Sequence, residues 1–377
     1  MKVVVAQEAL LKMLLKVSSV VTGKATSAEI YNCILLETLT ESLRMTGTDG
    51  DVTAMGEVSA QIDAPGTLAI PSKKLLEIVR KLPNKEIILD GNETGVTILC
   101  ARVNYKLTSF NPDIYPERPI LPGSYDYEIP AGLIAHLVDK VSFAVAVEDP
   151  RPAFNGIYWK TKENGFDLVA TDTHKLARIF LKTDPGQSPP ADKIIEAIIP
   201  PKALRLLSKL DTDQDTQLSI KLLSNHLLMR VNNFVIYSTL LRGPYPDYER
   251  VIPYTNDIIV EVDRQEFLDA VERVAIVSNA ITHMVKFSFS SGVVLLNGIN
   301  IDSGDEGSEE VPVVYSGDPI QIGFNGEYIQ SILKLLDSER IIIKLKGVGS
   351  AGMIVPVNQE EKEDLLYVIM PLKFTDI

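Results

Sequence analysis

The sequence predicts an α+β protein in which one domain pattern, two helices packed on antiparallel sheets, occurs three times. Three observations support this prediction. Similar helical and strand segments recur at intervals of roughly a third of the chain. Short β-branched strands outnumber the helices and follow one another as hairpins rather than as strand–helix–strand units. Three copies of this length account for all 377 residues, so the sequence predicts no fourth domain.

Each copy opens with a strand and an amphipathic helix. The three opening helices end in similar sequences, LLKV at Val17, VDKV at Val141 and VERV at Val274. A series of short strands follows the helix. In the first two copies this series contains a Thr-Asp turn, at Thr48-Asp49 and at Thr171-Asp172.

The second helix of each copy gives the clearest repeat. IPSKKLLEIVRKLP begins at Ile70 and places its apolar residues on one helical face. IPPKALRLLSKLD begins at Ile199 with the same Ile-Pro-x-Lys start, and FNGEYIQSILKLLD begins at Phe324. Further strands such as EIILDG, VTILCA and IIIKLKG complete the pattern.

The repeat spacing places the three domains at residues 1–123, 124–253 and 254–377. Proline-rich segments near residues 111–123 and 244–253 coincide with the ends of the first two copies. Proline interrupts both helices and sheet ladders, so we expect these segments to join the domains.

Composition and charge exclude several classes of protein. The net charge of −13 excludes a protein coated with basic residues, and no apolar run reaches the ~18 residues of a membrane span. Lys12 and Lys16 interrupt the apolar N-terminal stretch, which therefore predicts an amphipathic helix rather than a signal peptide. Cys33 and Cys100 lack CxxC spacing. A disulfide between these two residues is one interpretation, and two reduced core thiols of a cytosolic protein are the favoured one.

No motif of a catalytic or cofactor site is present. The sequence has no glycine-rich phosphate loop, no GxSxG and no HExxH, and its four histidines lack metal-ligand spacing. Asp172 and His174 could pair a carboxylate with an imidazole, but no nucleophile accompanies them. The sequence therefore predicts neither a catalyst nor a bound cofactor.

The acidic run at residues 301–310 resembles a calcium loop only superficially. With Asp302 as the first position, the third is Gly304 and the twelfth is Val313, where calcium needs oxygen ligands. We therefore expect a solvated acidic loop without a metal.

The predicted second helices carry basic faces on a protein that is acidic overall. In the first copy the basic residues of the segment are Lys73, Lys74, Arg80, Lys81 and Lys85. All of them except Lys85 fall at helical spacing on the face opposite the apolar stripe. In the second copy Lys202, Arg205 and Lys209 form a similar stripe. Solubilising outer faces are one interpretation. Repetition of these faces in an acidic protein favours a surface that follows the phosphates of a polyanion without reading its sequence.

Four separated motifs resemble the bacterial DNA polymerase III beta subunit family, the sliding clamps. The motifs are RPAFNGIYW (151–159), LVATDTHKLA (168–177), PYPDYERVIP (244–253) and YVIMPLKF (367–374). The resemblance runs the full length of the chain and keeps the three-copy organisation. Two positions of the second motif depart from the family pattern, since Thr173 replaces its glycine and Lys175 its arginine.

The resemblance implies a fold and an assembly. In that family three clamp domains form each chain, and two chains pair head to tail into a closed ring around duplex DNA, with the helices lining the hole. The implied function is that of a non-catalytic processivity factor that tethers the replicative polymerase to DNA, because enclosure keeps the partner at a high effective concentration. The implied localisation is the cytoplasm, at the nucleoid, without membrane contact.

The resemblance also implies partners and site residues. The partners are double-stranded DNA, a second copy of the chain, the DNA polymerase III α subunit, the clamp loader δ subunit, and other polymerases and repair proteins that carry short glutamine-led apolar peptides. The implied peptide groove comprises Phe154, Thr171, Thr173, His174, Lys175, Leu176, Pro246, Arg250, Val251, Val368, Ile369, Met370, Pro371, Leu372 and Lys373. The implied DNA contacts are Lys24, Lys73, Arg80 and Lys202. The implied dimer interface joins Tyr105 and Leu107 to Ile276 and Val277.

Two alternatives from different classes remain at this point. A clamp-like paralogue would act mainly as a recruitment scaffold for repair or mobile-element proteins. A hydrolase would use Asp172 and His174. Retention on nicked circular DNA separates the first alternative from a processivity clamp, and activity assays separate the second.

Overall fold

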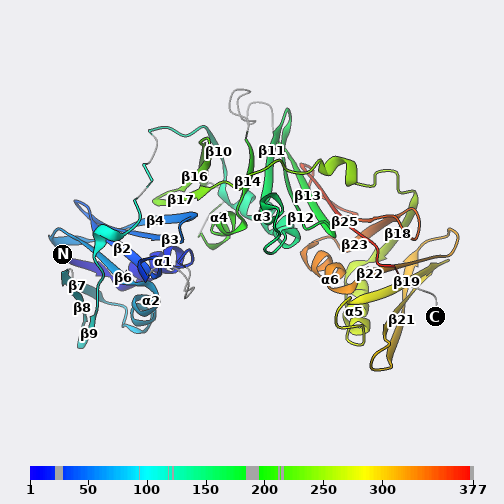
Figure 1. Ribbon diagram of the computed structural model, residues 1–377, viewed down its shortest axis with the longest axis horizontal. Helices are drawn as coiled ribbons and strands as arrows, with labels where there is room; N and C mark the ends of the chain where they lie inside the picture. Colours follow the sequence, from blue (N-terminus) through cyan, green and yellow to red (C-terminus); the bar gives the residue numbers. More distant parts are fainter. Residues whose placement is uncertain are drawn as a thin grey trace. The chain divides into compact units, whose positions relative to one another are not determined.

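The computed structural model describes residues 1–21, 29–92, 94–117, 119–120, 123–183, 195–210, 213 and 216–373 (Figure 1). The chain forms two compact units. The first unit comprises Met1–His136 and Lys202–Leu240, and the second comprises Leu137–Pro201 and Leu241–Ile377. The second predicted copy is thus divided between the units, because its strands join two different sheets.

The first unit contains two sheets. Its five-stranded sheet has the order β5 (Gln61–Ala64), β1 (Lys2–Ala6), β7 (Glu86–Asn92), β8 (Gly95–Cys100) and β9 (Val103–Leu107). Its eight-stranded sheet has the order β10 (Tyr127–Pro130), β15 (Gln217–Leu222), β16 (His226–Val231), β17 (Phe234–Thr239), β4 (Val52–Ser59), β3 (Ser42–Thr48), β2 (Cys33–Thr38) and β6 (Thr67–Pro71).

The second unit contains a twelve-stranded sheet. Its order is β14 (Glu196–Ile199), β11 (Ile157–Lys162), β12 (Gly165–Thr171), β13 (Lys175–Lys182), β25 (Glu363–Ile369), β24 (Gly352–Pro356), β23 (Arg340–Leu345), β18 (Ile258–Asp263), β21 (Asp305–Val314), β20 (Val293–Asn300), β19 (Met284–Ser290) and β22 (Ile320–Asn325). Every strand pair among the described residues of both units is antiparallel, as the hairpin pattern of the sequence predicts.

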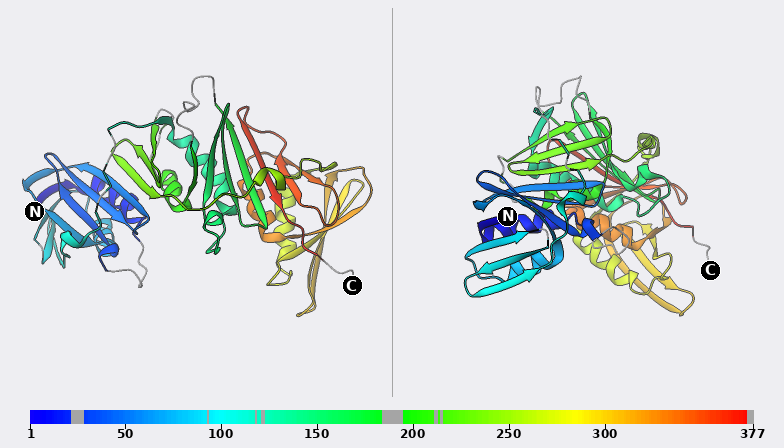
Figure 2. Two further views of the ribbon diagram at one scale, coloured as in Figure 1. Left: turned by 45° about the horizontal axis from the view of Figure 1, so that its top comes forward. Right: turned by 60° about the vertical axis from the view of Figure 1, so that its left-hand side comes forward.

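Among the described residues the helices follow the predicted order, two in each copy. They are α1 (Gln7–Ser18), α2 (Ser72–Lys81), α3 (Ala131–Val141), α4 (Pro201–Arg205), α5 (Arg264–Ala275) and α6 (Gly326–Leu335). Short 3-10 turns connect other elements: η1 (Glu29–Asn32), η2 (Pro112–Ile114), η3 (Ser142–Ala144), η4 (Pro152–Asn155), η5 (Leu207–Lys209) and η6 (Tyr248–Val251). In the second unit α5 and α6 lie side by side, α5 packing on β19 to β21 and α6 on β22 (Figures 1 and 2).

The predicted helix after Ile199 is much shorter than expected. Helix α4 ends at Arg205, and the amides of Lys209 and Leu210 bond to carbonyls three residues earlier, which defines the 3-10 turn η5. Helix α2 has the predicted amphipathic form, with Leu75 and Val79 buried and its basic residues exposed.

Two strand pairs join neighbouring copies into continuous sheets. In the first unit β17 of the second copy pairs with β4 of the first copy. In the second unit β13 of the second copy pairs with β25 of the third, with Leu176 opposite Val368. Each pairing covers a sheet edge that would otherwise be open. The repeat pattern predicts separate domains, and this sharing of sheets between them is not visible in it.

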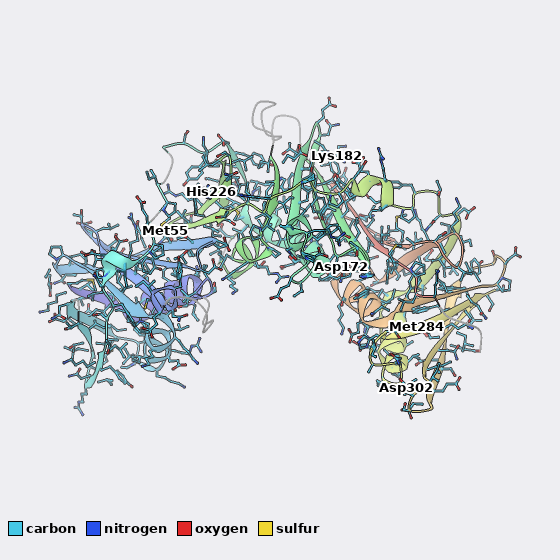
Figure 3. All side chains as sticks on the ribbon, in the orientation of Figure 1. Met55, Asp172, Lys182, His226, Met284 and Asp302 are labelled. Atoms are coloured by element: carbon cyan, nitrogen blue, oxygen red, sulfur yellow. The ribbon has the colours of Figure 1, made fainter. Side chains whose placement is uncertain are left out.

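Smaller features of the described residues concern the cysteines, the acidic loop and the lengths of the helices. Cys33 and Cys100 are buried free thiols. Asp302 is exposed near the end of the β20–β21 hairpin (Figure 3), and the described residues contain no group of acidic, histidine or cysteine side chains that could hold a metal. In the same described part of the chain, no helix has the length and apolar character needed to cross a membrane.

Candidate functional site

A groove of about 240 Å³ lies in the second unit, where the second and third copies share the sheet. Its lining residues come from four separated segments: Phe154, Thr171, Thr173, His174, Lys175, Leu176, Pro246, Asp247, Tyr248, Val251, Val368 and Met370. Beneath the groove, Leu176, Tyr248 and Val368 belong to one buried apolar cluster. The groove is therefore an apolar surface on a packed core, open to solvent at Val251 and Met370, which are 56% and 48% exposed.

The β12–β13 turn forms one side of the groove and is held by its own polar side chains. The Asp172 carboxylate oxygen Oδ1 accepts hydrogen bonds from the amides of His174 and Lys175, both at 2.9 Å. The Thr171 hydroxyl accepts from the Thr173 amide at 3.2 Å and donates to the Lys175 carbonyl at 2.7 Å. Because the side chains satisfy the turn's backbone groups, the turn has a defined shape without a bound partner.

This turn also fixes the end of the third copy beside it. The amide of Met370 donates to the carbonyl of His174 at 2.9 Å. The backbone therefore stays hydrogen-bonded to the turn for one residue beyond the end of β25 at Ile369. Asp172 lies at this end of the hairpin, beside helix α6 (Figure 3). Val368 and Met370 consequently line the groove together with Leu176.

Asp172 is not available as a catalytic base. Its Oδ1 holds two backbone amides, and its Oδ2 forms an ion pair with the Lys175 ammonium. His174 meets this carboxylate through its backbone amide, not through its ring. The hydrolase alternative needs a free carboxylate that orients the imidazole, and the geometry offers none.

Five predicted groove residues lie outside the lining. Arg250 is exposed and forms an ion pair with Asp247, with 2.7 Å between Nε and Oδ2. Ile369 is buried among Phe267, Phe324 and their neighbours, because alternate side chains of β25 point to opposite faces of the sheet. The remaining three, Pro371, Leu372 and Lys373, follow Met370. They leave the groove because the Leu372 amide bonds to the Gly323 carbonyl of β22 at 2.8 Å.

Lys175 lines the groove but its ammonium points elsewhere. The Lys175 Nζ pairs with Asp172 and lies 4.2 Å from the centre of the Tyr328 ring of α6. The ammonium is thus engaged within the turn and with α6, and its orientation of a ligand at the rim stays a prediction. His174, which is exposed in the lining, remains as a polar rim residue.

Asp247 and Tyr248 are lining residues that the sequence reasoning missed. Both lie in the quoted motif PYPDYERVIP, between the predicted Pro246 and Arg250. Tyr248 is buried, and its burial together with its hydrogen bond to Asp167 raises the pKa of the phenol. The sequence signal for Tyr248 is that an aromatic residue stands within a motif whose other members were predicted to line the groove.

The predicted DNA-contact residues differ in their surroundings. Lys73 and Arg80 are exposed on α2, and Lys24 lies outside the described residues. The Lys202 ammonium donates to the Val20 carbonyl at 2.6 Å and pairs with Asp49, so it is bound within the first unit. Its structural contacts compete with the predicted phosphate contact.

The predicted interface residues are surface residues in their respective units. Tyr105 is 41% exposed and Leu107 half-buried on β9, which is the edge strand of the five-stranded sheet. Ile276 is 81% exposed and Val277 half-buried, and both lie just after α5 rather than within it. The alternative that these residues belong to internal cores is wrong.

Sequence profiles identify the family over nearly the whole chain. The profiles of the N-terminal, central and C-terminal domains of the DNA polymerase III beta subunit match residues 1–119, 128–247 and 249–373. The chain belongs to the DNA polymerase III beta subunit family. Membership confirms the predicted three-domain α+β clamp fold, and with it the role of a sliding-clamp processivity factor without catalysis of its own.

Individual relatives agree with this assignment. The beta sliding clamp of Pseudomonas aeruginosa is 32% identical over 371 residues, which cover 98% of this chain and 99% of the relative. The beta sliding clamp of Staphylococcus aureus is 26% identical over 354 residues, covering 91% and 93%. A crystal structure of the Pseudomonas aeruginosa clamp bound to griselimycin has a TM-score of 0.89 at 31% identity and covers 99% of this chain and 100% of that one.

Proposed function

We propose that the groove defined above binds short peptides of polymerases and other replication proteins, and that two chains close into a ring that carries these partners along duplex DNA. The observation that carries the proposal is the groove itself. Four separated segments build an apolar surface with ordered polar groups at its rim, and such a surface suits a short ligand with apolar side chains.

The size and chemistry of the groove favour a peptide end. About 240 Å³ is less than the ~300–1,000 Å³ typical of sites that enclose a drug-sized ligand, and it suits a few apolar side chains. The lining includes Phe154, Val251 and the flexible thioether of Met370, which adapts to different partners. A glutamine-led peptide with apolar residues at its end fits this arrangement, with His174 near its polar groups.

Membership of the family supports a choice of partners. We expect the DNA polymerase III α subunit, the clamp loader δ subunit, and other polymerases and repair proteins to present such peptides. Because these partners act on replicating DNA, we expect the protein in the cytoplasm at the nucleoid.

Ring closure would use the two exposed surfaces described above. Strand β9 offers an open sheet edge with Tyr105, and the segment after α5 offers Ile276 and Val277. An open edge and an exposed apolar segment both gain from cover by a second chain. A head-to-tail homodimer would cover both surfaces in each chain.

Duplex DNA would meet the exposed basic face of α2. Lys73, Arg80 and their neighbours present charge without aromatic side chains between them, which suits phosphate contact and no reading of bases. Such contacts would let a ring slide, because each phosphate is equivalent to the next.

The test is retention on circular DNA. Protein loaded by a clamp loader onto nicked circular DNA should stay bound through gel filtration and should be released when the circle is linearised. Protein that is never retained by circular DNA, yet still binds polymerase peptides, would favour the alternative of a recruitment scaffold. Retention without any peptide binding would contradict the role proposed for the groove.

A further inference from the structure

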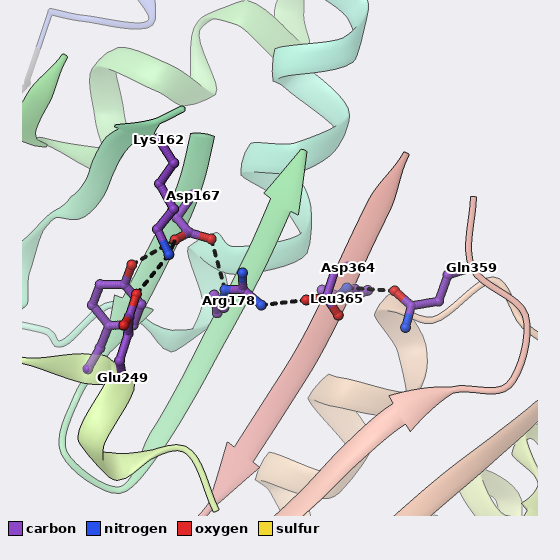
Figure 4. Close-up of polar contacts among 8 residues, drawn as sticks. Lys162, Asp167, Arg178, Glu249, Gln359, Asp364 and Leu365 are labelled. Carbon is purple, nitrogen blue, oxygen red and sulfur yellow. Dashed lines mark hydrogen bonds and ion pairs between the residues drawn. The ribbon is translucent and has the colours of Figure 1, made fainter. Parts of the chain in front are cut away.

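A fully buried carboxylate lies beneath the groove and is surrounded by cationic and hydroxyl donors. Asp167 of β12 is 0% exposed. Its Oδ1 accepts from the Arg178 Nε at 2.8 Å (Figure 4). Its Oδ2 accepts from the Lys162 Nζ and from the Tyr248 hydroxyl, both at 2.7 Å. A charge removed from water needs such partners, so each of the three donors is held in a definite place.

One of these donors belongs to the wall of the groove. Tyr248 begins η6, and it lines the groove together with Val251 at the end of the same turn. Glu249, the next residue, pairs with the same Lys162 ammonium at 2.7 Å, and this hydrogen bond lowers the pKa of Glu249. Two residues of η6 thus contact the Asp167–Lys162 pair: Tyr248 bonds to Asp167, and Glu249 bonds to Lys162.

These side-chain contacts replace backbone pairing. Within the described part of the chain, residues 242–251 form no backbone hydrogen bond to a strand. The Tyr245 hydroxyl adds one contact, to the Val169 carbonyl at 3.3 Å. Side chains therefore decide where η6 lies on the sheet.

The network also reaches the third copy. Arg178 on β13 donates from Nη1 to Asp364 of β25 at 2.6 Å. Next to Asp364, the Leu365 amide donates to the Gln359 side chain at 2.6 Å (Figure 4). Strand β25 ends at the groove, where Val368 contributes to the lining. One buried carboxylate is thus linked to both the η6 wall and the strand that faces it.

We propose that Asp167 is a positioning residue for the peptide groove, which it shapes by fixing Tyr248, and with it η6, against the β12–β13–β25 sheet. Asp167 does not line the groove and acts only through its partners. A wall fixed before binding spares the peptide the cost of ordering it. This inference rests on the peptide-binding function proposed above.

The decisive variant removes a single hydroxyl. Tyr248→Phe keeps the ring in the lining and removes only the hydrogen bond to Asp167. Tyr158→Phe is a matched control, because Tyr158 packs in the same buried cluster while its hydroxyl bonds to Glu196 at 2.6 Å. The probe is a short fluorescent peptide that starts with glutamine and ends in leucine and phenylalanine. We expect Tyr248→Phe to weaken its binding ~5-fold and Tyr158→Phe to leave it unchanged, at similar melting temperatures.

A second readout needs no peptide. In the free protein, methyl NMR signals of Val251 should shift in Tyr248→Phe and in Asp167→Asn, and should stay in place in Tyr158→Phe. Asp167→Asn should weaken peptide binding ~10-fold, and adding Tyr248→Phe to it should weaken binding little further, because both changes break the same hydrogen bond.

The outcomes separate the two proposals. Unchanged peptide affinity and unchanged Val251 signals in Tyr248→Phe would overturn the positioning role, as would equal reductions of affinity in Tyr248→Phe and Tyr158→Phe. A wild-type protein that binds no peptide would contradict the proposed function, while the Val251 signals would still decide whether Asp167 positions η6.

Discussion

Gly50 and Thr173 occupy the same position in two equivalent hairpin turns. Both have positive φ angles, +99° and +76°. In each turn the amide of this residue donates to the threonine hydroxyl two positions earlier, from Gly50 to Thr48 and from Thr173 to Thr171. A glycine adopts this conformation freely, whereas a β-branched residue adopts it only with steric strain. The second turn, which borders the groove, therefore stores strain that the first does not.

This relationship predicts opposite effects for two substitutions. Gly50→Thr should lower the stability of the first unit by ~1–2 kcal/mol, the cost of left-handed backbone for a residue with a Cβ. Thr173→Gly should leave stability unchanged or raise it by up to ~1 kcal/mol, because released strain is partly offset by the flexibility of glycine in the unfolded chain. Thermal unfolding measures both. A Gly50→Thr protein as stable as the wild type would show that the turn carries no such strain.

A charge in the groove should weaken peptide binding. Val251 lines the groove and is 56% exposed, so Val251→Glu should fold normally yet weaken binding of a glutamine-led apolar peptide at least ~10-fold, because the carboxylate is stripped of water on binding. Val348→Glu is the matched control, since Val348 is 55% exposed and lies outside the groove. Calorimetry on both variants checks this. Equal affinities for the two would place the peptide elsewhere.

A charge after α5 should prevent assembly. Ile276→Glu places a carboxylate in the proposed apolar contact and should convert dimers into monomers without lowering the melting temperature, since Ile276 is 81% exposed in the single chain. Ile114→Glu, at a residue that is 61% exposed on η2, is the control and should leave the dimer intact. Sedimentation velocity distinguishes the species. Persistence of the dimer in Ile276→Glu would move the interface to another surface.

Removal of charge from α2 should weaken DNA binding in a salt-dependent way. Lys73→Ala with Arg80→Ala should reduce affinity for short linear duplex, and the slope of log affinity against log salt should fall by ~0.9 for each phosphate that the variant no longer neutralises. The affinity should not depend on the base sequence of the duplex. Lys346→Ala, in the third copy, is the control. An unchanged slope in the double variant would exclude α2 from the DNA surface.

Lys202 should behave differently from Lys73. Because its ammonium binds the Val20 carbonyl and Asp49, Lys202→Met should lower the melting temperature of the first unit. We expect it to change the salt slope of DNA binding less than Lys73→Ala does. Weaker DNA binding at unchanged stability would show that the phosphate contact dominates at this residue.

Much of the groove could be predicted from the sequence because short motifs carry their own local geometry. The Thr-Asp turn forms from side-chain bonds to backbone amides two and three residues away, so the identity of Thr171 and Asp172 nearly suffices to specify it. The motif with Pro246 and Val251 likewise marked a wall of the groove, and Asp247 and Tyr248 were missed within it.

The differences between the predicted and the observed surroundings concern residues whose direction depends on distant partners. Ile369 and Val368 are neighbours in the sequence, and only the register of β25 against β13 decides which one faces the groove. Lys175 turns to Tyr328, and Lys202 to Asp49, because partners far away in the sequence offer a ring and a carboxylate. A sequence motif identifies these residues, but it does not determine the direction of their side chains.

The three-copy organisation, the α+β class, the order of strands and helices and the family could all be established from the amino-acid sequence, because they depend on periodicities and turns that act over a few residues. Only the tertiary structure shows that the copies share sheets through the pairs β17–β4 and β13–β25. Only the tertiary structure shows that the buried Asp167 links the groove wall to β12. Strand pairing and burial of charge depend on residues that meet only after folding, and no local pattern records which residues these are.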